Sequence, residues 1–169
     1  MKTYPAPDFI SSLGEAFLAH RFRRLSEAFV DDIQAFLQTQ GLRAPARSFS
    51  TLMLLDDAPG QSITQIADSV KLSHPLVIHL LSQLESLDLV RFTSDDNDRR
   101  RRLVFLTVAG EGEAERLRAA RPAIEAAYET LSAEVGIDLR SLVDKLDIAL
   151  GRQTFEQRLK AVTTPEIEL

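Results

Sequence analysis

Residues 62–110 decide the fold, and they read SITQIADSVKLSHPLVIHLLSQLESLDLVRFTSDDNDRRRRLVFLTVAG. The patterns within this stretch follow the order helix, tight turn, helix, and then two β-rich segments joined by a highly charged tip. In a winged helix-turn-helix, two short helices precede a β-hairpin wing in the same order. The stretch therefore predicts a winged helix-turn-helix with a two-stranded hairpin.

The first helix of this stretch begins with a capping sequence. Ser62 can accept a hydrogen bond from the backbone N–H of Gln65, and the side chain of Gln65 can reach back to the N–H of Ser62. Apolar residues then recur at helical spacing as far as Val70, which gives this helix one buried face. Lys71 and Leu72 are predicted to form the turn to the next helix.

The second helix is predicted to begin at Ser73, which is again a good capping residue. Pro75 falls in the first turn, where its missing N–H has no helical partner in any case. The predicted inward stripe consists of Val77, Leu80, Leu81, Leu84 and Leu87. The outward first turns of such a helix contact DNA. On the helix side of the interface, the predicted DNA contacts are Ser73, His74, Pro75, Leu76, Ile78 and His79.

The wing is predicted from two β-rich segments, one beginning at Val90 and one running from Leu103 to Leu106. The segment between them, TSDDNDRRRR, is too polar to pack. Charge runs are usually solvated without a partner, but this run follows a helix-turn-helix, which favours DNA contact. Arginine on a narrow ribbon also suits the negative potential of a minor groove. The wing residues predicted to contact DNA are Arg91, Arg99, Arg100 and Arg102.

The segments LSQLESLDLVRF and DDNDRRRRLVFLTVAG resemble the MarR family of bacterial transcription regulators. That family carries an Asp-x-Arg element in its wing, followed by a strand that ends in Leu-Thr-x-x-Gly. These positions fall here on Asp98, Arg100, Leu106, Thr107 and Gly110. The resemblance implies that Asp98 orients Arg100, which enters the minor groove. It also implies a homodimer that binds a pseudo-palindromic operator in double-stranded DNA, most often as a ligand-responsive repressor.

The chain departs from the family pattern at four positions. Members commonly have glycine in the turn between the two helices and again before the wing, where this chain has Lys71 and Asp88. The outward positions that are often Thr and Arg in the family are Ile78 and His79 here. These departures bear on the base preference and on the strength of DNA binding.

The composition narrows the classes of function. The chain has 169 residues, a formal net charge of −5 and no cysteine, which excludes disulfides and thiol-based sensing. The segment from Arg91 to Arg102 is nevertheless net positive. The acidic remainder of the protein would repel DNA, and this segment would attract it. No apolar run is long enough to span a bilayer, and the start lacks the apolar core of a signal peptide. We expect a cytoplasmic protein with no membrane partner.

Long amphipathic helices flank the predicted winged helix. The patterns predict one helix over residues 10–40, another over 44–57, and a third that Thr107 caps and that Pro122 kinks or breaks. A last helix is expected from Asp138 to about Val162. The predicted organisation is therefore mainly α, with an N-terminal dimerisation helix (residues 1–43), the winged helix-turn-helix (44–110) and C-terminal dimerisation helices (111–169).

The terminal helices carry more apolar surface than a small core can cover, so we expect a second copy of the chain to cover it. A small-molecule effector bound between the first, second and fifth predicted helices would change the spacing of the two recognition helices. The simpler interpretation of the phenylalanines of the first helix is that they belong to the core and do not line such a pocket. His20 could likewise lie at the dimer boundary. The residues predicted for an effector pocket are Phe17, His20, Arg24, Phe49 and Met53.

An enzyme is not expected, because the chain lacks a phosphate-binding glycine loop and the common nucleophile and zinc motifs. His74 and His79 are five residues apart, a poor spacing for a shared metal, so neither a metal nor a cofactor is predicted.

The alternative function is a winged-helix protein-interaction module with little or no DNA binding, suggested by the acidic charge and by the outward Leu76 and Ile78. A further enzymatic domain leaves no trace in this sequence.

Overall fold

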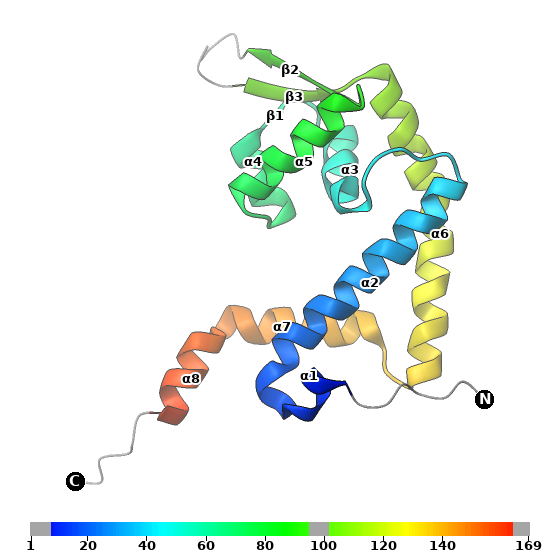
Figure 1. The fold of residues 1–169 in the computed structure, drawn as a ribbon. Coiled ribbons are helices and arrows are strands. Elements are labelled where there is room, and N and C mark those ends of the chain that lie inside the picture. The colour runs from blue at the N-terminus through cyan, green and yellow to red at the C-terminus, as the bar shows by residue number, and fades with distance from the viewer. Residues whose placement is uncertain (1–7, 95–101, 164–169) are drawn as a thin grey trace. The chain divides into compact units, whose positions relative to one another are not determined.

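The computed structural model describes residues 8–94 and 102–163, and it is mainly helical with one small antiparallel sheet (Figure 1). The predicted fold class, a mainly α winged helix-turn-helix with long terminal helices, is confirmed. The chain divides into two compact units, one up to Arg121 and one from Pro122 onward, which are described separately below. The domain boundaries predicted at residues 43 and 110 remain predictions.

The N-terminal helical segment is interrupted, so the prediction of one helix over residues 10–40 is wrong at its start. Helix α1 (Phe9–Ser12) is followed by a 3-10 turn, η1 (Gly14–Phe17), and then by the long helix α2 (Leu18–Thr39). The interruption occurs because Gly14 has a φ of +72°, in the left-handed region that an α-helix cannot contain. Gly41, also left-handed, follows the end of α2 as predicted.

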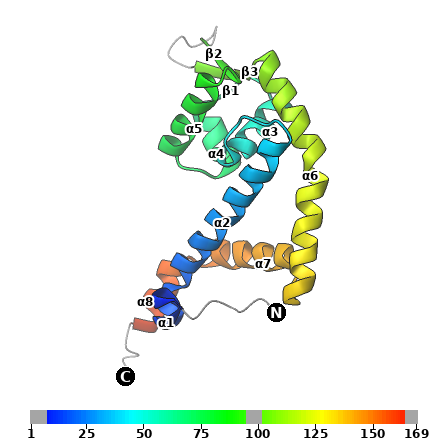
Figure 2. The same ribbon diagram turned by 45° about the vertical axis from the view of Figure 1, so that its right-hand side comes forward.

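The rest of the first unit alternates short helices and strands. It contains η2 (Ala46–Ser48), α3 (Phe49–Asp57), β1 (Gln61–Ser62), α4 (Ile63–Val70), α5 (His74–Ser86), β2 (Val90–Ser94) and β3 (Arg102–Leu106). The helix predicted over residues 44–57 begins later, because Pro45 is extended and a 3-10 turn precedes α3. In both ribbon views α3, α4 and α5 lie together on one side of the sheet (Figure 1, Figure 2).

The sheet has three strands rather than the two that the sequence predicted. Its order is β1-β3-β2 and all pairs are antiparallel, with Gln61 opposite Val104 and Val90 opposite Leu106. Gly60, at a φ of +77°, turns the chain into β1, and its N–H donates to the carbonyl of Val104 at 3.0 Å. A strand of two residues is too short to show an alternating pattern, which is why the sequence did not reveal it.

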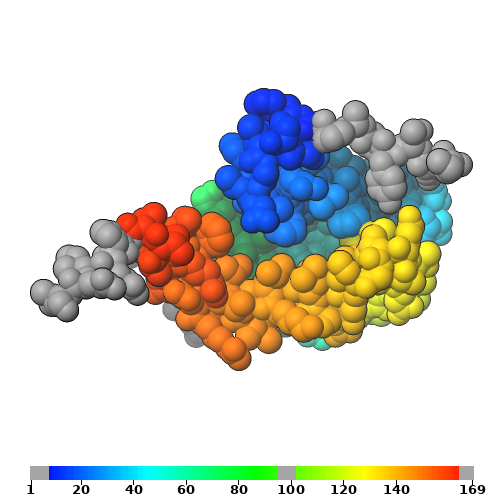
Figure 3. Space-filling view, turned by 90° about the horizontal axis from the view of Figure 1, so that it is seen from below, coloured from blue at the N-terminus to red at the C-terminus, as the bar shows by residue number. Residues whose placement is uncertain are grey.

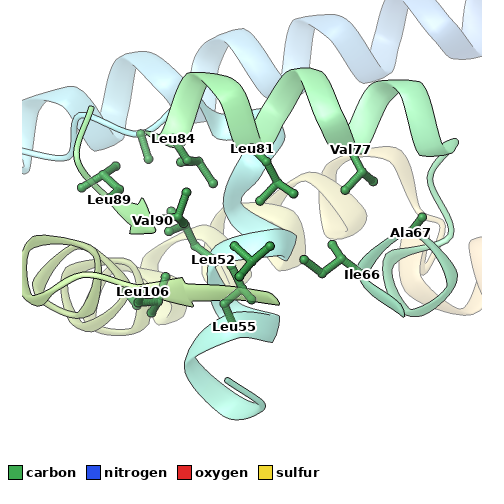
Figure 4. Close-up of a cluster of buried hydrophobic side chains, with 13 residues drawn as sticks. Leu52, Leu55, Ile66, Ala67, Val77, Leu81, Leu84, Leu89, Val90 and Leu106 are labelled. Carbon is green, nitrogen blue, oxygen red and sulfur yellow. The ribbon is translucent and has the colours of Figure 1, made fainter. Parts of the chain in front are cut away.

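The core of this unit lies between α5, α3, α4 and the sheet. Figure 4 shows Val77, Leu81 and Leu84 projecting from α5 toward the apolar side chains of the other elements. The predicted inward stripe is thus confirmed, except that Leu87 is half-buried. The other core residues are Ala44, Leu52, Leu55, Ile66, Ala67, Leu89, Val90, Val104, Leu106 and Ala114.

Helix α6 (Val108–Val135) is fixed to the end of the helix-turn-helix by two residues of the Leu-Thr-x-x-Gly sequence. The hydroxyl of Thr107 accepts a hydrogen bond from the N–H of Gly110 at 3.0 Å and donates to the carbonyl of Asp88 at 2.6 Å. A Cβ atom at residue 110 would lie 1.9 Å from the carbonyl oxygen of Leu89. Only glycine therefore permits this approach of α6 to the chain that leaves α5.

Glu113 fastens α6 to the segment that follows α2. Its side chain is fully buried, and it accepts hydrogen bonds from the N–H groups of Arg43 and Ala44 and an ion-paired hydrogen bond from Arg116 at 2.7 Å. Burial by itself raises the pKa of Glu113, but the hydrogen bonds from Arg116 and from the two backbone N–H groups outweigh it, so the pKa is lowered. The carboxylate is therefore charged at neutral pH and holds this junction together.

The second unit contains the rest of α6 together with α7 (Leu139–Arg152) and α8 (Phe155–Thr163). The sequence predicted either a kink or a break at Pro122, and α6 continues through this residue, so the break does not occur. The single last helix predicted from Asp138 is also wrong, because Gln153 is extended and separates α7 from α8. Figure 3 shows α7 and α8, coloured orange to red, following one another along the surface.

A capping pair that the sequence analysis overlooked explains this separation. The N–H of Gln157 donates to the hydroxyl of Thr154 at 3.2 Å, and the side chain of Gln157 accepts from the N–H of Thr154 at 2.9 Å. Such a reciprocal pair starts a new helix. In neither unit does a described helix combine the length and the apolar character that crossing a bilayer requires.

Candidate nucleic-acid interface

The turn between α4 and α5 sets the start of the predicted recognition helix. The capping box at the start of α4 is present as predicted, with the N–H of Gln65 donating to Ser62 at 3.3 Å and the N–H of Ser62 donating to the Gln65 side chain at 2.9 Å. Lys71 ends α4 in the left-handed region at a φ of 56°. Asp88, before the wing, has the same φ. Both residues thus adopt the backbone that glycine supplies in the family pattern. Lys71 is exposed and precedes α5 by three residues in the chain.

Ser73 occupies the position before α5 but does not cap it as the sequence predicted. Its carbonyl accepts the first helical hydrogen bond, from the N–H of Val77 at 3.0 Å, whereas its hydroxyl makes no capping hydrogen bond. Pro75 is in the first turn, as expected. The backbone N–H groups at a helix start attract anions, so this end of α5, together with the exposed Ser73 side chain, is suited to a DNA phosphate.

All the residues predicted to contact DNA from the helix side are exposed. The core takes Val77, Leu80, Leu81 and Leu84 from α5, and the remaining faces of its first turns are directed away from the core. Leu76 and Ile78 remain 39% and 46% exposed, and no Lys or Arg occurs anywhere in α5. The structure thus leaves Ser73, His74, Pro75, Leu76, Ile78 and His79 all accessible to solvent.

The two described arginines of the wing strands lie on opposite faces of the hairpin. Arg91 pairs across the strands with Phe105, and Arg102 pairs with Ser94. Because side chains alternate along a strand, Arg102 shares the face of the core residues Val104 and Leu106, whereas Arg91 is on the other face. The guanidinium of Arg102 lies 4.2 Å from the ring centre of Phe92, a cation–π contact that stiffens a side chain next to the core face.

Arg91 lines a shallow hollow that is separate from the outward surface of α5. Its guanidinium lies 4.8 Å from the ring centre of Phe105, and it donates to the hydroxyl of Thr93 at 3.1 Å. The hollow has a volume of about 420 Å³, and Arg118 forms an ion pair with Asp56 at its edge. Its other lining residues are Leu55, Pro59, Leu106, Glu111 and Glu115. Contact between Arg91 and DNA remains a prediction, and Asp56, Glu111 and Glu115 line the same hollow as Arg91.

The tip of the wing, residues 95–101, is outside the described residues. The predicted contacts of Asp98, Arg99 and Arg100 fall on this segment, and their roles remain predictions. Among the residues that the structure does describe, no group of His, Asp and Glu side chains is arranged to hold a metal ion.

The residues predicted for an effector pocket are not gathered within one chain. Phe49 and Met53 belong to α3, which follows η2, and η2 lies against the end of α2, where Gln34 accepts a hydrogen bond from the N–H of Ala46 at 2.5 Å. His20 precedes Gln34 by about 21 Å along the helix. Arg24 is ion-paired with Asp8 near the start of the chain. One copy of the chain therefore does not bring these residues together. The effector pocket remains a prediction, with the residues Phe17, His20, Arg24, Phe49 and Met53.

These elements define a winged helix-turn-helix protein, with α5 as its recognition helix and β2 and β3 as its wing. Residues 45–101, which contain α3, α4, α5 and β2, match the model of the MarR family. A search of curated proteins finds no match.

Two solved structures share the fold. S. aureus MepR, in a complex with DNA, is 22% identical, with a TM-score of 0.64, and the match covers 78% of this chain and 97% of that one. The transcriptional repressor CouR, bound to a 23-mer DNA duplex, is 24% identical, with a TM-score of 0.61, and the match covers 79% and 92% of the two chains. The similarity extends beyond the winged helix into the flanking helices.

Proposed function

We propose that this protein is a DNA-binding transcription regulator, most simply a repressor, that binds a pseudo-palindromic operator as a homodimer. The observation that carries the proposal is an exposed recognition helix next to an arginine-bearing wing, in a segment that matches the MarR family. Recognition-helix residues would contact base edges, while the wing arginines contact the backbone or the minor groove. In this role the protein is not an enzyme, and it acts in the cytoplasm where bacterial DNA lies.

Homodimer formation is part of the proposal because the described terminal helices leave large apolar side chains uncovered. On α2 these include Leu18, Phe22, Leu25 and Phe36, and on α7 and α8 they include Leu142, Leu146, Phe155 and Leu159. Large exposed apolar side chains gathered on helices in this way are typical of protein–protein interaction sites. A two-fold dimer covers both copies at once and gives two recognition helices for the two half-sites.

A response to a small molecule is also part of the proposal. An effector that binds one dimer geometry more tightly than another would change the spacing of the two α5 helices and hence the operator affinity. Residues Phe17, His20 and Arg24 are on the N-terminal part of the chain and Phe49 and Met53 on α3, so a shared pocket would require side chains from both copies. The affinity for DNA, measured with candidate effectors present, tests this part.

The experiment that tests the function is DNA binding by fluorescence anisotropy. A duplex from the region upstream of the gene is titrated at two salt concentrations, with nonspecific duplex as competitor. We expect sub-micromolar binding that survives the competitor and falls with salt, with a logarithmic slope of about −0.9 per phosphate contact. Arg100→Ala and Arg102→Ala should each lower the affinity about tenfold, whereas Arg140→Ala, an exposed arginine of the second unit, is the matched control.

The alternative is a winged-helix protein-interaction module. Its specific support is the formal net charge of −5 together with the exposed Leu76 and Ile78 on the recognition helix. Such a module would pass through a heparin column at moderate salt and bind every duplex weakly and equally. If the arginine variants and the control behave alike while DNA binding persists, the wing assignment is wrong.

A further inference from the structure

The outward surface of α5 combines exposed apolar side chains with a complete lack of cations. Leu76 is 39% exposed and Ile78 is 46% exposed, although both are in the first two turns of the helix. His74 and His79 are their exposed neighbours on the helix, and Ser82 continues the surface. From His74 to Ser86 the chain has no Lys and no Arg.

The fold itself gives no reason for these two apolar residues. The core is complete without them, since Val77, Leu80, Leu81 and Leu84 fill the inward face of α5 and are at most 2% exposed. Neither Leu76 nor Ile78 is among the buried residues of the core cluster or the partly buried residues that pack against it. A β-branched Ile on an exposed helix face also has a lower helix propensity than the polar residues that could replace it.

The chemistry of the major groove does offer a reason. Guanine presents two acceptors there, which Arg or Lys side chains usually contact, and thymine presents a C5-methyl group, which apolar side chains contact. Helix α5 has no cation for guanine, but it offers Leu76 and Ile78 where the first turns of a recognition helix meet base edges. The exposed apolar side chains of α5 are therefore suited to contact the methyl group of thymine.

The surroundings of the pair favour DNA over an apolar protein partner. Lys71 precedes α5 in the chain and Arg102 is on a wing strand, and both are exposed cations that can contact phosphates. Two separate side chains are also far too small a surface for a stable protein interface, which buries at least about 1,000 Å² in total. An uncharged contact surface with exposed cations elsewhere in the winged helix suits a thymine-bearing groove between phosphate backbones.

We propose that Leu76 and Ile78 are specificity-determining residues that contact thymine methyl groups in the major groove, so that the protein prefers A·T-rich half-sites. This inference rests on the proposed function, because it assumes that α5 enters the major groove. The electrostatic contacts then supply affinity for any duplex, and the two apolar side chains select among sequences.

The test replaces thymine with uracil, which removes the methyl group and keeps the base-pairing pattern. Duplexes are first selected by the full-length protein from a random pool, and the affinity for the selected duplex is then compared with that for its uracil-substituted copy. We expect each contacted methyl group to contribute about fourfold in affinity, the value for burying one methylene-sized group. Leu76→Ala and Ile78→Ala should bind more weakly and lose much of the sensitivity to uracil.

Val108→Ala is the matched control, because Val108 is an 86% exposed apolar residue of the same unit. It should keep the full sensitivity to uracil. The inference is overturned if uracil and thymine duplexes bind equally, or if uracil costs the wild type and both α5 variants the same factor. If the pool yields no preferred duplex and binding does not depend on salt, the proposed function fails, and the inference fails with it.

Discussion

The two units of this protein use amphipathic helices in opposite ways. In the first unit α3, α4, α5 and the sheet meet around thirteen buried residues (Figure 4). In the second unit, none of the described residues is buried. Most of its large apolar side chains are exposed, namely Tyr128, Val135, Ile137, Leu142, Val143, Leu146, Ile148, Leu150, Phe155, Leu159 and Val162.

The difference shows that amphipathicity alone does not produce a core. In the first unit α3, α4 and α5 cross one another and the sheet, so that the apolar faces of these short helices find several partners. Helix α2 of the same unit does not share this enclosure, since Leu18, Phe22 and Leu25 remain exposed. In the second unit, α6, α7 and α8 follow one another along the chain, and this arrangement encloses no such core. We therefore expect the stability of the buried core formed by α3, α4, α5 and the sheet to be intrinsic, and that of the second unit to depend on protein concentration through dimerisation.

The largest effect is expected from a charge placed on the unpartnered surface of the second unit. Leu146→Glu puts one carboxylate from each copy into the proposed dimer interface, where an unpaired buried charge costs several kcal/mol. We expect dimerisation to weaken by at least about 4 kcal/mol, roughly a thousandfold. Analytical ultracentrifugation measures the change. Lys145→Glu alters charge at an exposed neighbouring position of α7 and should leave the dimer largely intact.

A dimer that withstands Leu146→Glu would place this face of α7 outside the interface. The contrast between the units would then need another explanation, such as a partner of a different kind. Concentration dependence of the unfolding temperature, measured on the wild type, gives an independent check.

The next largest effect is expected at Glu113, which anchors the first unit. Glu113→Ala removes the acceptor of two backbone N–H groups and of Arg116, so we expect a loss of about 3 kcal/mol in the free energy of unfolding. Urea denaturation measures this loss. The matched control is Glu115→Ala, an exposed carboxylate on the same helix, which should change the stability by at most about 0.5 kcal/mol.

The same carboxylate predicts a pH dependence. Because the folded pKa of Glu113 is lowered, its contribution to stability is fully present above the pKa of the unfolded chain, about 4.3. That contribution is lost as the pH falls through the lowered folded value. The stability difference between the wild type and Glu113→Gln should therefore be constant from pH 6 to 8 and shrink below about pH 4. A difference that grows on acidification would contradict the assignment.

A somewhat smaller effect is expected from Gly110→Ala. The added Cβ would meet the carbonyl oxygen of Leu89, a backbone atom that cannot swing aside, so α6 must shift relative to the end of the helix-turn-helix. We expect a destabilisation of about 2 kcal/mol, typical of overpacking in a core, measured by thermal unfolding. Gly112→Ala is the control, because a Cβ there comes no closer than 3.9 Å to a neighbouring atom. Equal effects at the two glycines would rule out the close approach as the cause.

Local signals in the sequence predicted much of the fold. The Ser62–Gln65 capping box, the inward stripe of α5 and the strand beginning at Val90 depend on residues that are close in the chain. The break between α7 and α8 was predictable in the same way, since Thr154 and Gln157 repeat the capping spacing of Ser62 and Gln65. Gly14 was likewise visible, but a glycine can be tolerated within a helix, so its left-handed φ could not be assigned.

The remaining features depend on contacts between distant parts of the chain. Glu113 binds backbone N–H groups of Arg43 and Ala44, and backbone groups leave no pattern in the side-chain sequence. In the candidate site, the exposed residues of α5 followed from its inward stripe. The opposite faces of Arg91 and Arg102 did not, because they depend on the hairpin register, which a long polar tip leaves undetermined.

The smallest effect is expected from Thr51→Val, and its sign is opposite to the others. Thr51 is fully buried in α3, and its hydroxyl has no hydrogen-bond partner among the described residues. Valine has nearly the same shape and carries no polar atom to desolvate, so we expect the free energy of unfolding to rise by about 1 kcal/mol. Urea denaturation should show the midpoint shifting upward with an unchanged slope. Thr64→Val, at an exposed position of α4, tests for a general effect of the substitution. A loss of stability on Thr51→Val would mean that the hydroxyl does have a hydrogen-bond partner, such as a bound water. The core of the first unit would then contain water beside its apolar side chains.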